Sequence, residues 1–452
     1  MTLEVVILAA GQGTRMRSSR SKVLHEVAGK PMLQHVVDAA AALNASRTHI
    51  VVRPDADDLK ARIEGDPVWV VQAEQNGTCH AVAQALPGVD EGSVVLVLYG
   101  DVPLVTTETL KACADAAAAG AVSLVTAMFE DPAELGRIVR ENNVIQRIVE
   151  FKDATDEQRA IREINSGILA ARKQTLEQLM SQVGNDNAQG EYYLTDIIGL
   201  AVEQNIPVEG VFAASEMEVT GVNNRMQLAE VERAYQAQAA AALMAAGVTM
   251  ADPSRVDIRG TVTAGQDVYL DVNVVLTGEV ELGTGTHIGP GCVINDATLG
   301  EDVHVEPHTL IDGAVIASGC TLGPFARIRP GTELSEGAKV GNFVETKKAK
   351  LGRGSKANHL TYLGDVTLGE GCNVGAGTIT CNYDGVNKHK TTIGDDVFVG
   401  SNSTLVAPVE LDNGSFVAAG STITSRVTEG ELAVGRGKQR NIKGWTRPDK
   451  KS

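Results

Sequence analysis

A glycine-rich segment near the N-terminus carries the first groups suited to phosphate chemistry. Gly11-Gln12-Gly13-Thr14-Arg15 follows an apolar run, Val5–Ala10. Glycines directly after a strand let the backbone approach phosphates and offer its N–H groups, and Arg15 adds a fixed cation. The segment lacks the Gly-Lys-Ser/Thr ending of a P-loop and the third glycine of a dinucleotide fingerprint. On spacing alone it is either a phosphate-binding loop of a different kind or an ordinary turn between a strand and a helix.

Two further segments of the N-terminal half offer groups for a nucleotide base and a metal ion. Gln72 precedes Gly77 and Thr78, and its amide supplies the donor and the acceptor that a pyrimidine edge requires. Asp101 follows the apolar strand Ser93–Tyr99, where a carboxylate is well placed for Mg²⁺. The same residues also fit simpler structural roles, as a loop that leads into a helix and as a turn that follows a strand.

His359 is the candidate general base of the C-terminal half. Because histidine titrates near neutral pH, its ring nitrogen can take a proton from a reacting group. His359 lies in one of three segments that interrupt a six-residue repeat, and the other two contain Lys347 and the Asn382-Tyr383 pair. The third segment is a polar loop of about a dozen residues, and loops of that length in a compact fold are often functional. A structural histidine in a turn is the alternative.

The interrupted repeat extends over about Val256–Ile423. An aliphatic residue recurs at every sixth position, with a shift of phase after Ile294. A period of six indicates hexapeptide repeats wound into a parallel β-helix, whereas the strands of a β-sandwich recur at about 8–12 residues. The residue after the aliphatic is often Gly or Asp, as at Gly283, Gly289 and Gly400, and we expect it to take the positive φ of a corner. The pattern resembles that of left-handed β-helices.

Residues 1–223 alternate apolar strands with helical stretches, which predicts an α/β domain with a mostly parallel sheet. Ligands of such domains gather at the carboxyl ends of the strands, and Gly11 and Asp101 follow two of these ends. A long helix over Asn224–Ala246 with a narrow apolar stripe is expected to link the two halves. The expected strands of this part are Val5–Ala10, His49–Arg53, Val68–Gln72 and Ser93–Tyr99, and the expected helices are Pro31–Ala42 and Gly77–Leu86.

Composition excludes several classes of protein. The 452-residue chain has a net charge of −17, which argues against non-specific binding of nucleic acid. No stretch is long and apolar enough to span a membrane, and no signal peptide is recognisable. Six scattered cysteines without a C-x-x-C motif suit a reducing compartment and indicate no zinc site. We therefore expect a cytoplasmic location.

The N-terminal motif L-A-A-G-x-G-T-R-M, followed by Lys22 in K-V-L-H, resembles that of sugar-nucleotide pyrophosphorylases. The resemblance implies that the loop wraps a nucleoside triphosphate while Arg15 and Lys22 steady its phosphates. Ser21 stands where the family commonly has Pro. The resemblance also implies that Asp101 and Asn223 bind Mg²⁺. The nucleotide and sugar site that it implies comprises Leu8, Ala9, Ala10, Gly11, Lys22, Gln72, Gly77, Thr78, Tyr99, Gly100, Asp101, Gly136, Glu150, Asn165 and Asn223.

Four C-terminal motifs, N-F-V-E-x-K-K-A, H-L-T-Y-L-G-D, G-A-G-T-I-T-C-N-Y-D-G and I-G-D-D-V-F-V-G-S, resemble those of the acetyltransferase half of a bacterial family. Its members are bifunctional enzymes that make UDP-N-acetylglucosamine, and the resemblance covers essentially the whole chain in order. It implies that His359 is the base and that Arg329 and Lys347 hold the sugar phosphate. The remaining implied contacts to sugar and acetyl-CoA are Tyr362, Asn373, Ala376, Asn382, Tyr383, Ser401, Ala419 and Arg436.

The chain is therefore expected to have three parts. These are a Rossmann-like α/β nucleotidyltransferase domain over residues 1–225, a helical linker over 226–246, and a left-handed parallel β-helix acetyltransferase domain with a C-terminal tail over 247–452. The family resemblance implies acetylation of glucosamine 1-phosphate with acetyl-CoA, then transfer of UMP from UTP, with Mg²⁺ as cofactor and a homotrimer formed through the β-helix. The alternatives are a pyrophosphorylase whose β-helix is structural or regulatory, and a trimeric scaffold.

Overall fold

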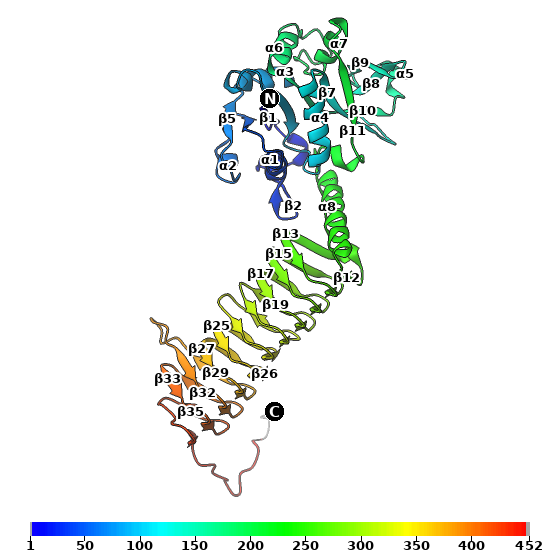
Figure 1. Ribbon diagram of the computed structural model, residues 1–452. Helices are drawn as coiled ribbons and strands as arrows, with labels where there is room; N and C mark the ends of the chain where they lie inside the picture. The colour runs from blue at the N-terminus through cyan, green and yellow to red at the C-terminus, as the bar shows by residue number, and fades with distance from the viewer. Residues whose placement is uncertain (1, 449–452) are drawn as a thin grey trace. The chain divides into compact units, whose positions relative to one another are not determined.

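A computed structural model describes residues 2–448, and the chain divides into two compact units, residues 1–235 and 236–452. The division lies within the long helix α8 (Arg225–Ala245), which Figure 1 shows in green. No helix in the described part of the chain is long and apolar enough to cross a membrane. Each unit has its own hydrophobic core and is described separately.

The first unit is built on a nine-stranded sheet, in which β6 is the middle strand of the main seven-strand path and β1 lies next to it. β1 pairs in parallel with β4 and β6, and β4 pairs in parallel with β5. β10 runs antiparallel to both β6 and β7, and a hairpin of β8 and β9 joins it at one end. The order along the sheet is β11 (Val208–Phe212), β7 (Val122–Met128), β10 (Glu163–Arg172), β6 (Val94–Tyr99), β1 (Leu3–Leu8), β4 (Arg47–Val52) and β5 (Val68–Val71), with β8 (Arg137–Glu141) and β9 (Val144–Val149) beside β10.

Helices cover both faces of this sheet, and successive strand residues point to these opposite faces. Ile7 belongs to a hydrophobic cluster that includes residues of α1 (Met32–Ala42) and α4 (Thr107–Ala119), whereas its neighbour Val6 belongs to a separate cluster. This two-sided burial explains the continuous apolar runs of the central strands, such as residues 5–8 of β1 and 94–98 of β6, as the sequence predicts for the first of them. The other helices are α2 (Asp57–Lys60), α3 (Thr78–Ala85), α5 (Asp156–Arg159), α6 (Lys173–Met180) and α7 (Asp196–Glu203).

The second unit is a stack of coils whose paired strands are all parallel, the predicted parallel β-helix (Figure 1). One sheet contains β12 (Thr249–Met250), β14 (Tyr269–Leu270), β16 (His287–Ile288), β18 (His304–Val305), β21 (Thr321–Leu322), β24 (Lys339–Asn342), β26 (Lys356–His359), β28 (Asn373–Val374), β31 (Phe398–Val399), β34 (Phe416–Val417) and β36 (Leu432–Ala433). The left-handed winding of the coils stays a prediction, which rests on the resemblance of the hexapeptide pattern to that of left-handed β-helices.

A second, 14-stranded sheet forms the remaining sides of the coils. Its members are β13 (Val256–Ala264), β15 (Val274–Leu282), β17 (Val293–Leu299), β19 (Leu310–Asp312), β20 (Val315–Ile316), β22 (Arg327–Ile328), β23 (Glu333–Leu334), β25 (Glu345–Leu351), β27 (Tyr362–Leu368), β29 (Ile379–Cys381), β30 (Thr391–Ile393), β32 (Thr404–Val406), β33 (Val409–Leu411) and β35 (Thr422–Ile423).

Strand register shows how the repeat accommodates its irregularities. Val256 pairs with Val274, 18 positions later, whereas Val293 pairs with Leu310, 17 positions later. The shorter coil accounts for the shift of phase in the sequence. Ile379 pairs with Thr404, 25 positions later, so this coil contains the inserted polar loop.

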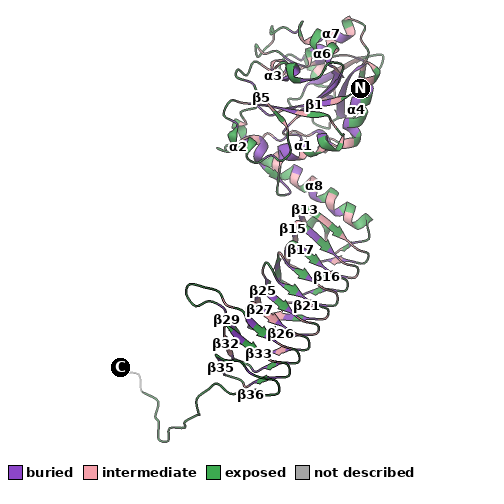
Figure 2. Cartoon of the chain, turned by 60° about the vertical axis from the view of Figure 1, so that its left-hand side comes forward, coloured by how far each residue is buried: buried purple, intermediate pink, exposed green. Residues whose placement is uncertain are grey.

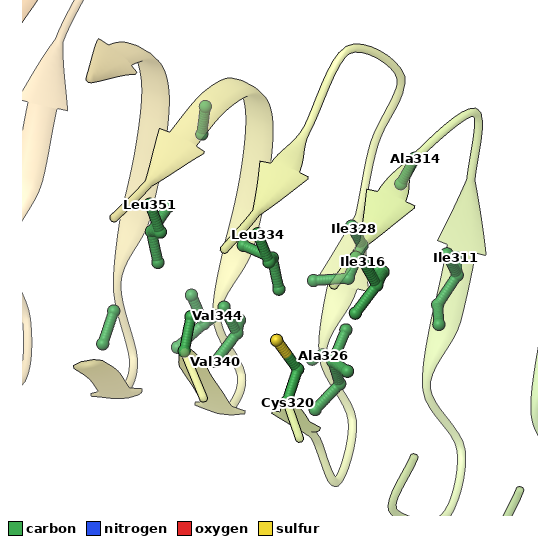
Figure 3. Packing of buried hydrophobic residues seen from close by; sticks show 14 of the residues in the cluster. Ile311, Ala314, Ile316, Cys320, Ala326, Ile328, Leu334, Val340, Val344 and Leu351 are labelled. Carbon is green, nitrogen blue, oxygen red and sulfur yellow. The ribbon is translucent and has the colours of Figure 1, made fainter. Parts of the chain in front are cut away.

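The aliphatic repeat forms the interior of the coils, as predicted. Ile311, Ile328, Leu334 and Val340 point inward in Figure 3 and are at most 2% exposed. Full burial of an aliphatic side chain contributes roughly 1.5–3 kcal/mol to folding, and the stack repeats this contribution coil after coil.

The expected role of the glycines after the aliphatic residues is wrong at several positions, although Gly323 does have the expected positive φ (92°). Gly283, Gly289 and Gly400 do not have positive φ; the positive φ falls two residues later, for example at Gly285 (φ 72°) and Asn402 (φ 62°). A Cβ on Gly400 would lie 2.4 Å from the backbone nitrogen of Ala419 in the next coil. These glycines are therefore needed because consecutive coils approach closely, and the corners are made by the later residues.

The helix α8 contributes to each unit by a different part of its apolar stripe. Val231 is fully buried in the first unit, whereas Leu243 packs against the β-helix core. Asn224 caps the helix, since its Oδ1 accepts from the backbone nitrogen atoms two and three residues later. Gly247, with φ 105°, follows the end of the helix, as the sequence predicts.

Candidate active sites

A cavity of about 400 Å³ lies at the carboxyl ends of β1 and β6. Most residues of the predicted nucleotide site line it, together with four that the prediction did not include. The lining consists of Leu8, Ala9, Ala10, Gly11, Lys22, Val23, Gln72, Gln75, Gly77, Thr78, Ala81, Tyr99, Asp101, Glu191 and Asn223.

Three polar side chains from distant segments converge in this cavity. Lys22 lies at the start of a short 3₁₀ turn, Asp101 directly follows β6, and Asn223 precedes α8. The Lys22 Nζ atom donates to the Asp101 carboxylate and, at 3.0 Å, to Oδ1 of Asn223. The Lys22 and Asp101 side chains are only 13% and 15% exposed, so their mutual attraction is screened less than that of a surface pair.

The oxygen atoms of Asp101 and Asn223 fit the predicted Mg²⁺ site. Both reach one point, which the Lys22 ammonium marks, and a carboxylate with an amide oxygen is the type of ligand that Mg²⁺ prefers. Within residues 2–448 no group of three or more His, Cys, Asp or Glu side chains could hold a metal ion. A magnesium ion at this point must therefore take its other ligands from substrate phosphates and water, as it commonly does.

The glycine-rich segment is fixed in place by its neighbours. Gly13 has φ 59°, and a Cβ there would lie 2.6 Å from Cβ of Lys22. Gln75 donates to the carbonyl of Ala10 at 2.8 Å, which joins the segment to the predicted base-binding loop. Arg225 donates to the carbonyl of Met16 at 3.3 Å. These contacts hold the segment and the lysine in one arrangement.

Arg15 lies apart from the other predicted phosphate ligands. Its side chain is exposed and lines a second cavity of about 650 Å³, together with Gly221 and Gln227. Asn223 lines both cavities. The structure therefore places Arg15 and Lys22 on two cavities that meet at Asn223.

The predicted base-binding loop is held against a segment that precedes α7. The Nε2 atom of Gln72 donates to the carbonyl of Gly77 at 3.3 Å and lies 3.2 Å from Nδ1 of His80. Gly77 has φ 109°, and a Cβ there would lie 2.5 Å from the carbonyl oxygen of Tyr192. Glu191, next to Tyr192, lines the cavity. Only glycine allows this close approach, which fixes one wall of the cavity.

The predicted sugar contacts lie together beside Tyr99. The backbone N–H of Asn165 donates to the carbonyl of Gly136 at 2.9 Å, and a Cβ on Gly136 would lie 3.3 Å from the Glu150 carboxylate. Burial raises the pKa of Glu150. Burial also raises the pKa of Tyr99, and the nearby charges of Glu150 and Asp101 add to this effect. Tyr99 therefore connects the sugar contacts with the residues at the metal position.

His359 lies at the end of β26, at the corner where the 11-stranded sheet meets the 14-stranded sheet. Its side chain is exposed, and its Nδ1 atom lies 2.7 Å from Oδ1 of Asn342 on the preceding coil. Thr361 donates its hydroxyl to the backbone carbonyl of His359 at 2.7 Å. The Nδ1 atom of the ring is therefore hydrogen-bonded, and the bond from Thr361 stabilises the backbone of the corner.

The small residues predicted for acetyl-CoA follow His359 along the same corner. Backbone bonds join successive coils there: Asn402 donates to the carbonyl of Ala376 at 2.7 Å, and Gly420 donates to that of Ser401 at 2.8 Å. The Arg436 guanidinium donates to the carbonyl of Ala419. The side chains of Ala376, Ser401 and Ala419 leave room at this corner, and the structure brings this predicted group together with His359.

The predicted phosphate-binding cations lie on the adjoining face. Arg329 donates to the Glu345 carboxylate at 2.6 Å, and Lys347 occupies the next coil. Lys388, then Arg329, lowers the pKa of Lys347, because positive charges held close together disfavour each other. Convergent cations of this kind favour an anionic ligand. Lys388 was not among the predicted site residues.

The long loop after β29, which leaves the coils in Figure 2, is a structured hairpin. Tyr383 forms an antiparallel bridge with Lys388, and His389 lies 2.7 Å from the Asp384 carboxylate. Asn382 is buried and donates to the Asp365 carboxylate on the preceding coil. The hairpin therefore holds Lys388 in place.

Two predicted sugar contacts lie on either side of the His359 corner. Tyr362 begins β27 in the 14-stranded sheet, and its ring lies over Gly364, where a Cβ would be 2.4 Å from the hydroxyl oxygen. Asn373 begins β28 in the 11-stranded sheet.

Asn342, Lys388 and Gln75 belong to segments that the sequence identified, but no spacing rule distinguishes them there, because their side chains acquire partners only across coils or between loops. Glu191 lies outside the segments considered in the sequence analysis.

Together, the fold and the two groups of side chains define a transferase with a nucleotide-binding α/β domain followed by a hexapeptide-repeat domain. Family models agree: residues 5–190 match a MobA-like NTP transferase domain, residues 258–351 the C-terminal domain of GMPPB, and residues 390–425 the bacterial transferase hexapeptide of six repeats.

The chain is 55% identical over 450 residues to the bifunctional protein GlmU of Marinobacter nauticus, a match that covers 99% of each protein. It therefore belongs to the GlmU family, and it is a bifunctional nucleotidyltransferase and acetyltransferase. The solved structure of a UDP-glucose pyrophosphorylase complexed with UDP-glucose matches 52% of this chain and 98% of its own. Its 16% identity and TM-score of 0.44 are too low to carry an argument.

Proposed function

We propose that the two described sites carry out the two reactions by which this bifunctional enzyme produces UDP-N-acetylglucosamine. The β-helix site acetylates glucosamine 1-phosphate with acetyl-CoA. The α/β site then transfers UMP from UTP to N-acetylglucosamine 1-phosphate and releases pyrophosphate. The convergence of Lys22, Asp101 and Asn223 in the first cavity is the observation that carries the second assignment.

In uridylyl transfer the sugar phosphate attacks the α-phosphorus of UTP, and pyrophosphate leaves. Mg²⁺ held by Asp101 and Asn223 supplies positive charge next to the phosphates when it is bound. Lys22 adds an ammonium inside the cavity, and Arg15 adds a guanidinium on the neighbouring cavity. Phosphoryl transfer depends mainly on positioning and on such electrostatic stabilisation.

The residues around these cations select and orient the substrates. Gln72 and the Gly77-Thr78 backbone face the uracil, and the loop Leu8–Gly11 wraps the triphosphate. Gly136, Glu150 and Asn165 hold the sugar and its N-acetyl group. Tyr99 and Gly100, at the end of β6, lie between the residues for the nucleotide and the residues for the sugar.

In acetyl transfer the neutral amine of glucosamine 1-phosphate attacks the thioester carbonyl of acetyl-CoA. His359 takes the proton that the amine loses, an N–C bond forms, and the thiolate of CoA leaves and is protonated. Arg329 and Lys347 hold the sugar phosphate, with Lys388 as a third cation on the hairpin. Tyr362 and Asn373 orient the sugar.

The acetyl-CoA is held along the corner formed by Ala376, Ser401 and Ala419, with Arg436 beyond it and Asn382-Tyr383 on the hairpin. Small side chains at the corner leave space for the thioester and its pantetheine arm. A β-helix with only a structural or regulatory role would require neither this corner nor the convergent cations beside it.

The assay that tests both assignments uses purified protein, glucosamine 1-phosphate, acetyl-CoA, UTP and Mg²⁺. Free thiol and pyrophosphate are measured separately. The proposal expects thiol release without UTP, and pyrophosphate release when N-acetylglucosamine 1-phosphate is supplied instead of the acetyl donor. Absence of thiol release would remove the acetyltransferase assignment and leave the alternative of a structural β-helix.

A homotrimer that forms through the β-helix is part of this proposal. A row of apolar residues lies exposed along the His359 corner: Phe325, Phe343 and Leu360 are 50%, 56% and 62% exposed. The rings of Phe325 and Phe343 stack with centroids 5.6 Å apart, and the ring of His308 stacks on that of Phe325 with centroids 5.1 Å apart. Exposed apolar rows mark protein contacts more often than they mark free surface.

A cytoplasmic location is also proposed, supported by six free cysteines.

A further inference from the structure

We propose that Asn342 is the positioning residue that holds His359 in the tautomer required for acetyl transfer. The inference rests on the proposed role of His359 as the base. It is carried by the 2.7 Å contact between Oδ1 of Asn342 and Nδ1 of His359. Nothing in the sequence motifs assigns a role to Asn342.

The contact determines which ring nitrogen is free. An amide oxygen has lone pairs and no hydrogen, so it can only accept, and Nδ1 of His359 must carry the proton that it donates. In a neutral imidazole the other nitrogen, Nε2, then keeps its lone pair. Asn342 therefore presents Nε2 as the proton acceptor, and it fixes the plane of the ring through the same bond.

The backbone makes this geometry rigid. Asn342 and His359 are register partners on the parallel strands β24 and β26, one coil apart. The residues that follow them, Phe343 and Leu360, both have positive φ, 56° and 50°. Leu360 donates its N–H to the carbonyl of Asn342 at 3.0 Å. Both side chains therefore leave the same braced corner in the same direction.

The choice of an amide has a chemical consequence. In residues 2–448 no carboxylate forms an ion pair with His359, and the flanking strands carry Lys339, Lys356 and Glu345 as their nearest charged residues in sequence. A carboxylate at Nδ1 stabilises the imidazolium, whereas a neutral amide orients the ring without adding that charge. Asn342 thus orients the ring and adds no charge to the group that must accept the proton.

Two substitutions separate positioning from simple support of the coil. Asn342→Leu removes the acceptor at nearly constant volume, and we expect kcat for acetyl transfer to fall about 10- to 100-fold, the usual effect of losing a group that orients a catalytic ligand. The KM for glucosamine 1-phosphate should change little. Asn342→Asp keeps the acceptor but adds a charge, so it should move the acidic limb of the pH–rate profile upward by about one pH unit.

A matched control is available upstream. Asn295 donates to Asp312 across consecutive coils with the same spacing of 17 residues. Asn295→Ala should leave acetyl transfer unchanged if the effect of Asn342 is specific. Uridylyl transfer by each variant, measured on the same preparation, and the thermal denaturation midpoint report whether the protein has folded.

The outcomes are distinct. If Asn342→Leu keeps kcat within about twofold of the unaltered enzyme and Asn342→Asp leaves the pH profile in place, the inference is overturned. His359→Ala is measured in parallel: if it keeps full acetyl transfer, the proposed base is wrong, whereas its inactivity together with unaffected Asn342 variants removes only the positioning role. A fall in kcat with Asn342→Leu, together with a displaced pH–rate profile with Asn342→Asp, supports the positioning role of Asn342.

Discussion

The ammonium nitrogen of Lys22 lies 3.0 Å from Oδ1 of Asn223, although 201 positions separate the two residues in the chain. The same nitrogen contacts the Asp101 carboxylate. One cation thus occupies the point at which the two proposed metal ligands meet. Lys22 therefore offsets the charge of Asp101 here, and Asp101 and Asn223 would hold Mg²⁺ at this point, where the ion would supply positive charge next to the phosphates.

Lys22→Met should therefore affect uridylyl transfer alone. Loss of a cation aimed at the developing phosphate charge should lower kcat by about 10²- to 10³-fold. Lys22→Arg keeps the charge and should retain more activity than Lys22→Met. Pyrophosphate release measures the effect, and thiol release from acetyl-CoA is the internal control. Equal activity of the Met and unaltered enzymes would exclude a role for this ammonium.

Gly77→Ala tests the close approach between the base-binding loop and Tyr192. A Cβ at Gly77 would lie 2.5 Å from the Tyr192 carbonyl oxygen, so the loop must move, and the KM for UTP should rise several-fold. Gly65→Ala is the matched control, because Gly65 has a similar φ of 100° and nothing within 4 Å of a Cβ. Positive φ alone costs about 1–2 kcal/mol in either variant. Identical KM values for UTP in the two variants would show that the Tyr192 contact is irrelevant.

The hairpin that carries Lys388 should depend on the charge of Asp384. The His389 side chain, then the backbone N–H groups of Asn387 and Val386, hold the pKa of Asp384 well below its usual range. A carboxylate with a lowered folded pKa contributes stability above its unfolded pKa of about 3.9, and the contribution is lost as pH falls through the folded value. An NMR titration of the Asp384 carboxyl should therefore show a midpoint below that of a free aspartate.

Asp384→Ala should in addition release the hairpin at neutral pH. Proteolysis within residues 382–390 should accelerate, and the KM for glucosamine 1-phosphate should rise because Lys388 is no longer held. Asp412→Ala, which breaks a contact with Arg426 elsewhere on the β-helix, is the control. An ordinary aspartate midpoint, or an unchanged rate of proteolysis, would contradict the proposed order in the hairpin.

Phe343→Glu tests the proposed trimer contact. A charge in the exposed apolar row should disfavour a buried interface by several kcal/mol and shift the enzyme toward monomers. Native mass spectrometry at a fixed protein concentration measures the change. Val315→Glu places the same charge on another exposed apolar residue of the β-helix and should leave assembly intact. A trimer that persists with Phe343→Glu would place the interface elsewhere.

Much of the fold follows from the sequence because its two periodicities are strong. The apolar strands of the first unit are buried on both faces, and the six-residue repeat supplies an inward side chain at each position, as at Ile328 and Leu334. The role of the glycines could not be deduced in this way. Gly400 could be needed for a corner or for the close approach of Ala419. Which of these holds depends on the distance between coils, and that distance cannot be read from the sequence of a single coil.

The sites were predictable in part for a related reason. Motifs identify Asp101 and His359, since each residue type and its local position suit the chemistry. The partners are set by the three-dimensional arrangement: Lys388 reaches Lys347 only because a hairpin folds back, and Asn342 reaches His359 only because coils repeat at 17 residues there. Arg15 is predicted with Lys22 but lies on the neighbouring cavity.

The central claim is that one chain contains two separate active sites. Its most direct test is a crossed measurement of thiol release and pyrophosphate release in His359→Ala and Asp101→Ala, with each reaction supplied with its own substrates. The account predicts that His359→Ala loses thiol release and keeps pyrophosphate release, and that Asp101→Ala shows the reverse. Loss of both activities in either variant, or normal thiol release from His359→Ala, would contradict it.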